Sequence, residues 1–155
     1  MSRQEELYVR KIRNGTVIDH IEAGRALDVL RILDITGKEG MTLSMAINVP
    51  SCKLGKKDIV KIEGRSLDQG EVDKIALIAP KATINLIQDF KVAKKEGVQL
   101  PARITGIIKC ANPTCISNGR EPAPHIFLVD NTEPLRLRCH YCNRAMDKED
   151  VVNQF

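Results

Sequence analysis

CANPTCISNG (residues 110–119) and RCHYCNRAMD (138–147) contain four of the chain's five cysteines and decide how its C-terminal part folds. The spacing is Cys110-x4-Cys115-x23-Cys139-x2-Cys142. Two close pairs can present four thiolates tetrahedrally around one ion, which suits zinc. Four thiolates fill the coordination shell, whereas a catalytic zinc usually keeps one position open for water. The spacing therefore predicts one structural Zn2+ ion, with metal-free thiols or disulfides as the alternatives.

The segment around these cysteines contains few large apolar residues. Short β-like runs are expected around the cysteines, over 104–109, 126–130 and 135–139. Burial alone is not expected to fold such a segment, but structural zinc contributes roughly 10–16 kcal/mol in small peptides. We expect His140, between the second pair, to be a surface side chain rather than a metal ligand. Cys52, in a turn after Pro50, is expected to be an incidental loop cysteine.

Upstream of the cysteines, the sequence alternates in the manner of β-strands. MTLSMAINV (41–49) has apolar residues at every second position, which predicts a half-buried strand that ends at Pro50. A hairpin is expected at Asn14-Gly15, because Asn-Gly favours tight turns between strands. The other expected strands are 6–12, 15–21, 58–63, 82–87 and 89–93.

Two helices are expected between these strands. The first spans residues 24–35, and the second follows the capping-box pair Asp68 and Glu71 and ends before Pro80. These elements predict an α+β fold, with an N-terminal, mostly antiparallel sheet and two helices followed by a small β-rich zinc-binding domain. KKEGVQLPAR (94–103) is expected to be a linker, which divides the chain into domains 1–97 and 98–155.

The charge distribution argues against a nucleic-acid partner. The net charge is +4, with 17 Lys/Arg against 14 Asp/Glu in residues 1–100 and 7 against 6 in residues 101–155. A generic polyanion binder would have a stronger basic excess. The N-terminus has no apolar run of signal-peptide length, and no stretch approaches the ~18 apolar residues of a membrane span. We therefore expect a cytoplasmic protein without a membrane partner, in which thiols stay reduced.

Several polar residues of the first domain suit a small anionic ligand. Lys57, Lys61 and Lys95 lie on separate elements and can meet a triphosphate if the strand ends converge. From composition alone, ordinary solvated lysines on exposed strands are the favoured interpretation. No Walker-type loop accompanies them. Asp19 and His20 are adjacent, and strand neighbours point to opposite faces, so an acid–base dyad is not expected. Asp19 suits a ribose hydroxyl better.

Several segments together resemble one known family. NGTVIDHI, INVPSCKLGKKDIVKIEG, ALIAPKATINLIQDFKVAKK and CANPTCISN…CHYC closely resemble the regulatory chain of aspartate carbamoyltransferase, in order and spacing, over roughly residues 7–152. The resemblance implies a chain that is not an enzyme and has no catalytic residues. It implies an N-terminal allosteric domain that binds ATP, CTP or UTP and a zinc domain that docks on the catalytic chain. It also implies regulatory homodimers, three of which link two catalytic trimers into a dodecamer.

The resemblance also implies a role for individual residues. The base would be contacted by Val9, Lys11, Ile12, Ile87 and Phe90. The ribose would be held by Asp19 and Lys61. The triphosphate would be faced by Lys95, His20 and Val92, and the pocket would be completed by Lys57 and Asn85. The zinc ligands would be Cys110, Cys115, Cys139 and Cys142. The catalytic chain would be contacted near Thr114, Tyr141 and Arg144.

Three positions differ from the family's usual residues. Phe90 replaces a frequent Tyr, Lys94 replaces a Gly, and Thr114 replaces an Asn at the interface. These changes affect nucleotide preference and interface detail. Two other functions compete with this interpretation: a zinc-ribbon protein that binds nucleic acid, and a free-standing enzyme that uses Asp19 and His20.

Overall fold

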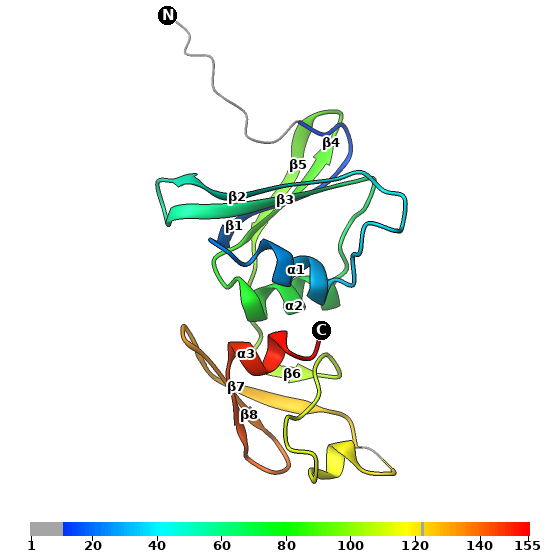
Figure 1. Cartoon of the computed structure of the whole chain (residues 1–155), viewed down its shortest axis with the longest axis vertical. Helices are drawn as coiled ribbons and strands as arrows, with labels where there is room; N and C mark the ends of the chain where they lie inside the picture. The colour runs from blue at the N-terminus through cyan, green and yellow to red at the C-terminus, as the bar shows by residue number, and fades with distance from the viewer. Residues whose placement is uncertain (1–10, 122) are drawn as a thin grey trace, which may run out of the picture.

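The computed structural model describes residues 11–121 and 123–155, which form two antiparallel sheets joined by a short connection (Figure 1). The N-terminal sheet has five strands in the order β2-β3-β1-β4-β5. Its strands are β1 (Gly15–Glu22), β2 (Leu43–Ser51), β3 (Gly55–Glu63), β4 (Thr83–Gln88) and β5 (Lys91–Gly97). All four strand pairs are antiparallel, so the predicted sheet type is confirmed.

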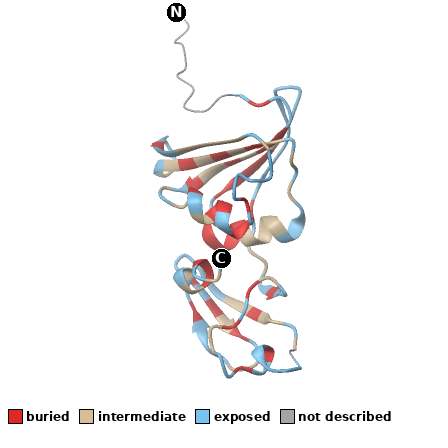
Figure 2. Cartoon of the chain, turned by 45° about the vertical axis from the view of Figure 1, so that its right-hand side comes forward, coloured by how far each residue is buried: buried red, intermediate tan, exposed pale blue. Residues whose placement is uncertain are grey.

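Two helices cover one face of this sheet, on the side toward the C-terminal part (Figure 1). They are α1 (Ala26–Ile32) and α2 (Gln69–Ile78). The predicted capping box of α2 is present, because Asp68 accepts from the Glu71 N–H and Glu71 accepts from the Asp68 N–H. Figure 2 shows buried residues, in red, on the helices and on the strands of the sheet. The fully buried side chains between these layers include Ile18, Val29, Val60, Ile62, Ile75 and Ile78.

The C-terminal part has its own four-stranded sheet, in the order β6-β7-β8-β9. Its elements are β6 (Arg103–Thr105), the 3-10 helix η1 (Ile116–Asn118), β7 (Ile126–Thr132), β8 (Leu135–Cys139), β9 (Ala145–Met146) and α3 (Lys148–Val152). A small core of Phe127, Leu137, Met146 and Val151 is almost fully buried. The α+β class with a β-rich C-terminal part is therefore confirmed.

Several predicted boundaries are wrong. The helix expected over 24–35 is shorter, Ala26–Ile32, and the strand expected over 104–109 is only Arg103–Thr105. β2 does not end at Pro50 but continues to Ser51, with Pro50 opposite Lys56. β2 is an edge strand, where proline's missing N–H costs no ladder hydrogen bond. The predicted linker begins too early, because β5 runs to Gly97. All seven residues of β5 are exposed, and charged residues are common on edge strands because they discourage further pairing.

The predicted Asn14-Gly15 hairpin is not established. Most of its first arm, residues 6–12, lies outside the described residues, and Lys11 and Ile12 are not in a strand. β1 does begin at Gly15, where an added Cβ would lie 2.1 Å from the Ile62 carbonyl oxygen. Glycine is required here because its backbone passes so close to β3.

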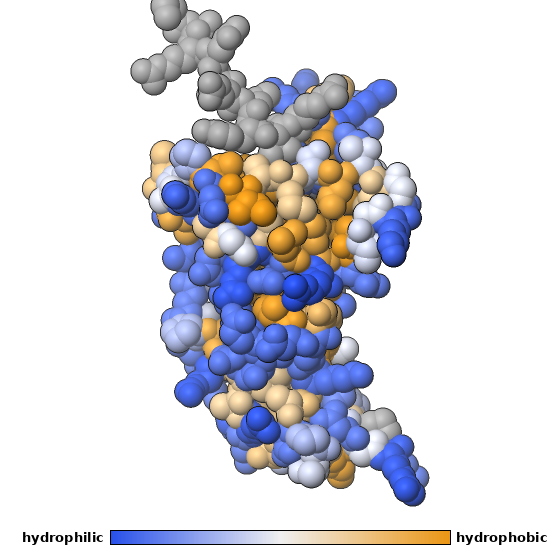
Figure 3. All heavy atoms as spheres, in the orientation of Figure 1, coloured by the Kyte–Doolittle hydropathy of each residue, from blue (hydrophilic) through white to orange (hydrophobic). Residues whose placement is uncertain are grey.

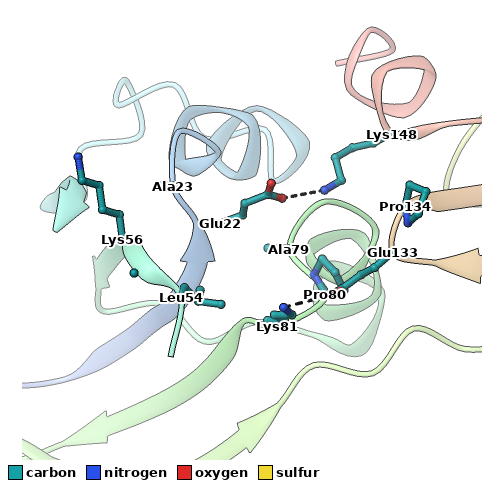
Figure 4. A pocket seen from close by; sticks show the side chains of 11 residues that line it. Glu22, Ala23, Leu54, Lys56, Ala79, Pro80, Lys81, Glu133, Pro134 and Lys148 are labelled. Carbon is teal, nitrogen blue, oxygen red and sulfur yellow. Dashed lines mark hydrogen bonds and ion pairs between the residues drawn. The ribbon is translucent and has the colours of Figure 1, made fainter. Parts of the chain in front are cut away.

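Among the described residues, three ion pairs join the two parts of the chain. Arg25 after β1 contacts Glu149 of α3 at 2.9 Å, Lys148 contacts Glu22 at 2.9 Å, and Lys81 contacts Glu133 at 3.7 Å. A cavity of about 910 Å³ lies at this junction. Figure 4 shows Lys148 directed toward Glu22 and Lys81 toward Glu133, while Lys56 points away from both pairs.

Candidate functional site

The four cysteines of the opening stretches meet at one point in the C-terminal part. Their sulfur atoms all lie within 4.8 Å of one another. The Cys110–Cys142 and Cys115–Cys139 Sγ distances are 3.6 and 3.7 Å. A disulfide bond needs about 2.05 Å, whereas Zn–S bonds of about 2.3 Å in a tetrahedron separate the sulfurs by about 3.8 Å. The arrangement therefore fits a four-thiolate metal site and not disulfides.

Different elements supply the two cysteine pairs. Cys139 ends β8, and Cys142 follows in the tight turn before β9, where Asn143 has φ +61°. Cys110 and Cys115 belong to the loop before η1, which is braced by the Asn118 side chain donating to the carbonyl oxygens of residues 110 and 112 at 2.9 Å. The two loops thus form a preformed cradle for one ion.

The surroundings shift the pKa values of the cysteine thiols in different directions. The Ser117 hydroxyl donates to Cys115 Sγ at 3.1 Å and lowers the pKa of that thiol. Burial raises the pKa of Cys110 to about 12. For Cys142, burial acts to raise the pKa, but hydrogen bonds, led by the Arg144 N–H, outweigh it and bring the pKa to about 7. A bound cation would compensate the desolvated Cys110 thiolate, since metal coordination deprotonates thiols.

The residues predicted at a protein interface surround this metal site. Thr114 and Arg144 are exposed, and Tyr141 is half-buried, with its hydroxyl donating to the Pro124 carbonyl at 2.8 Å. His140 is exposed, as predicted. Ile116, which the sequence did not single out, has 63% of its surface exposed beside Cys115. An exposed isoleucine on a metal-braced loop is well suited to a protein contact.

A second candidate site lies on the face of the N-terminal sheet opposite the helices. It is a cavity of about 440 Å³. Nine predicted residues line it: Lys11, Ile12, Asp19, Lys61, Asn85, Ile87, Phe90, Val92 and Lys95. His20 and Lys57 adjoin it through contacts with Asp19, while Val9 lies outside the described residues. The lining also includes Val17 and Ile59, which the alternation next to Asp19 and Lys61 could have indicated.

Strand alternation and one β-bulge place these residues on one face. Lys57, Ile59 and Lys61 alternate with the buried face of β3. A register shift between Leu86 and Ile87 puts Val92 and Lys95, three residues apart, on the cavity side of β5. Without this bulge, an odd separation would turn one of them to the opposite face.

The expectation that Asp19 and His20 point apart is wrong. A register shift in β1 between Ile18 and Ile21 interrupts the alternation, and His20 has φ +55°. The His20 Nδ1 atom lies 3.9 Å from Asp19 Oδ2 and 3.2 Å from Thr83 Oγ1. The bulge thus brings the His20 ring beside the Asp19 carboxylate, between it and Thr83 of β4.

The charges of this region are partly paired. Lys57 Nζ contacts Asp19 Oδ1 at 2.9 Å. Burial lowers the pKa of Lys61; the negative charge of Asp19 opposes this shift, and the positive charge of Lys11 adds to it. Burial also lowers the pKa of His20, and Asp19 only partly offsets this effect. The cavity combines several ammonium groups with one carboxylate, and the exposed rings and methyls of Phe90 and Val92 form its rim.

No helix in residues 11–121 or 123–155 is long and apolar enough to cross a membrane.

Comparisons with known proteins agree with this two-part organisation. A family model described as "Aspartate carbamoyltransferase regulatory chain, allosteric domain" matches residues 7–99. A second, described as "Aspartate carbamoyltransferase regulatory chain, metal binding domain", matches residues 102–152.

Named relatives are similar over almost their whole length. The aspartate carbamoyltransferase regulatory chain of Thermofilum pendens is 57% identical over 152 residues, which is 97% of this chain and 96% of the relative. Those of Korarchaeum cryptofilum and Thermococcus kodakarensis are 55% and 53% identical, over 97% and 96% of this chain and 97% of each relative. These proteins are named as regulatory chains, in agreement with the expectation that this chain is not itself an enzyme. The chain belongs to the family of aspartate carbamoyltransferase regulatory chains.

Proposed function

We propose that this chain is the non-catalytic regulatory subunit of an aspartate carbamoyltransferase, acting in cytoplasmic pyrimidine biosynthesis. In this proposal, domain 1–97 binds the effectors ATP, CTP and UTP, and domain 98–155 docks on the catalytic chain. The observation that carries the proposal is the convergence of three lysines, one carboxylate and an apolar rim on one cavity beside the sheet.

The chemistry of the cavity is suited to the parts of a nucleotide. Lys95 on β5 is a point charge available to a phosphate group. Asp19 can accept hydrogen bonds from ribose hydroxyls, and Lys61 adjoins it across the strand pair. Phe90 is 59% exposed, and its ring offers an apolar face to a base. The larger junction cavity is less suitable, because Lys81 and Lys148 are already paired with glutamates there.

The metal is proposed to be one structural Zn2+ held by Cys110, Cys115, Cys139 and Cys142. With four thiolates the shell is closed, so the metal holds the two loops in shape and performs no chemistry. Thr114, Tyr141 and Arg144, together with the exposed Ile116, would form the surface offered to the catalytic chain. Loss of the metal would then release that partner.

Assembly is proposed to follow the family's architecture, with regulatory homodimers that link two catalytic trimers into a dodecamer. β2 is an edge strand of the five-stranded sheet, and Ile47 on it is 42% exposed. On the face seen in Figure 3, hydrophobic atoms, in orange, gather over the N-terminal sheet. An exposed apolar strand edge suits pairing with a second copy through the N-terminal domains.

The proposed signal passes along β1 to the junction. Asp19 adjoins the nucleotide cavity, and three residues later Glu22 ends β1 and pairs with Lys148 of α3. Arg25 follows and pairs with Glu149. An effector shifts the assembly only through different affinities for its quaternary states, and typical coupling is about 1–3 kcal/mol. The direction of each nucleotide's effect depends on those affinities.

Calorimetric titration of the metal-loaded chain with ATP, CTP and UTP tests the proposal, together with effector titration of activity after mixing with the catalytic chain. We expect saturable nucleotide binding by the isolated chain, no turnover by it alone, and altered activity of the mixed complex. Tight, salt-dependent binding to DNA or RNA without nucleotide binding would favour the nucleic-acid alternative. Carbamoyl transfer or other turnover by this chain alone would contradict the proposal.

A further inference from the structure

We propose that Asp58, on the helix-facing side of β3, is a positioning residue that fixes the geometry of the nucleotide cavity without touching the ligand. This inference rests on the proposed nucleotide function. Asp58 is completely buried, which is costly for a carboxylate unless its oxygens are satisfied. Within residues 11–121 and 123–155 it forms no ion pair with a lysine, arginine or histidine.

Backbone groups from three segments satisfy this carboxylate instead. Oδ2 accepts from the N–H groups of Gly24 and Ala26, both at 2.9 Å, and Oδ1 accepts from the Asn48 N–H at 2.8 Å. Gly24 follows β1, Ala26 begins α1, and Asn48 belongs to β2. Arg25, at the start of α1, makes no side-chain cap, so the carboxylate of Asp58 caps this helix from a neighbouring strand.

Asp58 lies opposite both β-bulges of its neighbouring strands. In β1, the three steps from Ile18 to Ile21 face two steps of β3, from Val60 to Asp58, with Ile21 opposite Asp58. In β2, the register likewise slips between Ala46 and Val49, on either side of Asn48. A bulge leaves backbone groups outside the ladder. The carboxylate satisfies one of them directly, the Asn48 N–H.

Both bulges contain a residue in a conformation that L-residues seldom adopt. His20 has φ +55° in β1, and Asn48 has φ +61° in β2. Such conformations cost free energy and persist only when the surroundings enforce them. The carboxylate of Asp58 lies where it can hold both residues in these conformations. It accepts a hydrogen bond from the Asn48 N–H itself, and it fixes the segment after β1 through the Gly24 N–H.

The β1 bulge shapes the nucleotide cavity. It carries Asp19, which lines the cavity, and His20, whose ring reaches Thr83 on β4. The two sequence neighbours of Asp58 face the cavity side, with Lys57 paired to Asp19 and Ile59 in the lining. If the carboxylate no longer held the bulges, Asp19, His20 and Lys57 would lose their fixed relative positions, although none of them had been changed.

The test compares Asp58→Asn with Asp68→Asn in the full-length, metal-loaded chain. Asparagine keeps the shape of the side chain but can turn an N–H2 group toward the backbone N–H donors. Asp68 is the matched control, because its carboxylate also caps a helix of the same sheet domain but is exposed and does not line the cavity. Asparagine is itself a good N-cap, so helix α2 is retained in the control.

Calorimetry with ATP is expected to give a Kd about tenfold higher for Asp58→Asn, comparable to the loss of one charge-assisted hydrogen bond, and a nearly unchanged Kd for Asp68→Asn. The measurement is made well below each variant's melting temperature, so that a lower stability alone does not change the Kd. NMR of the His20 ring supplies an independent signature: its resonances should shift in ligand-free Asp58→Asn and stay in place in Asp68→Asn.

Hydrogen exchange of the unchanged chain keeps the inference testable if Asp58→Asn does not fold. ATP should slow exchange of the Gly24, Ala26 and Asn48 amides more than that of the Glu71 amide, which bonds to Asp68. If Asp58→Asn folds, binds ATP with wild-type affinity and leaves the His20 signals unshifted, the role of Asp58 is overturned but the nucleotide proposal is not. Equal effects of ATP on all four amides would have the same consequence. Absence of ATP binding by the unchanged chain would overturn the nucleotide proposal and this inference with it.

Discussion

Replacing Lys95 by alanine should weaken nucleotide binding, whereas the same change at its neighbour Lys94 should not. Lys95 lies opposite Asn85 in the β4–β5 ladder and lines the cavity. Lys94 lies opposite Leu86, does not line the cavity, and pairs with Glu96 at 3.3 Å. The two variants remove the same charge from adjacent positions of one exposed strand, so they separate a direct phosphate contact from a general loss of positive charge.

The size of the effect follows from the position of each ammonium group. A hydrogen bond to a charged group contributes about 1.5–3 kcal/mol, and every 1.4 kcal/mol changes Kd tenfold. Since Lys95 is exposed to water, the lower end applies, and Kd for ATP should rise about 10- to 30-fold. Lys94 acts only through a screened field at 0.15 M salt, where the Debye length is about 8 Å, so its loss should change Kd by less than about threefold.

Calorimetric titration at fixed salt measures both variants, and effector titration of the mixed complex with the catalytic chain provides the functional readout. Lys95→Ala should still assemble with the catalytic chain but respond weakly to ATP and CTP. A Kd for Lys95→Ala equal to that of the unchanged chain would refute the assignment of the sheet-face cavity. Equal losses in both variants would show that only net charge matters.

Three further perturbations probe the metal site, the protonation of His20 and the small C-terminal core. Cys139→Ser should lose the metal, and Cys52→Ser, which removes an exposed cysteine outside the cluster, should keep one ion per chain by elemental analysis; equal metal content in the two would contradict the site. Burial lowers the pKa of His20 in the folded chain below its ordinary 6.5, so the folded state disfavours the protonated ring. The free energy of unfolding should therefore be highest above pH 6.5 and should fall as the pH drops from 6.5 through the folded-state pKa. Urea unfolding across this pH range should show this decrease, and the His20→Gln variant should show a smaller one. An equal pH dependence in the variant would mean that His20 does not cause it. Phe127→Ala should lower the free energy of unfolding by about 3–5 kcal/mol, because Phe127 is fully buried in the C-terminal sheet. Denaturant unfolding monitored by metal release would measure this loss, and a loss below about 1 kcal/mol would mean that the metal alone stabilises this part of the chain.

Features set by local spacing were predictable from the sequence. The two cysteine pairs are each confined to one turn, so their meeting required only that the β-rich segment close on itself. The α2 capping box depends on Asp68 and Glu71, three residues apart, and was also identified correctly. The alternation of β2 gave its position, but its end was misplaced because whether Pro50 interrupts a strand depends on that strand lying at the sheet edge.

Features set by tertiary contacts were not predictable in this way. Nothing local marks the β1 bulge that brings Asp19 and His20 together, since it lies where β1 pairs with β3 beside Asp58, whose carboxylate accepts from the chain after β1, from α1 and from β2. The bulge in β5 between its partners Leu86 and Ile87, which brings Val92 and Lys95 to the cavity side, likewise leaves no local mark in the sequence. Asp19, Lys61 and Lys95 stood out by residue type, whereas the resemblance added Lys11, Ile12, Asn85, Ile87, Phe90 and Val92, because a family's motif carries the result of tertiary packing that a single chain's pattern does not display.

The most direct test of the account is co-purification of this chain with an aspartate carbamoyltransferase catalytic chain, with the metal present and after its removal by chelation or a mercurial. We predict a stable mixed complex with the metal and dissociation without it, while calorimetry of the released regulatory chain still detects ATP binding by the N-terminal domain. Failure to form a mixed complex with the metal in place, or a complex that survives complete metal removal, would contradict the claim that the four cysteines hold the surface that binds the catalytic chain.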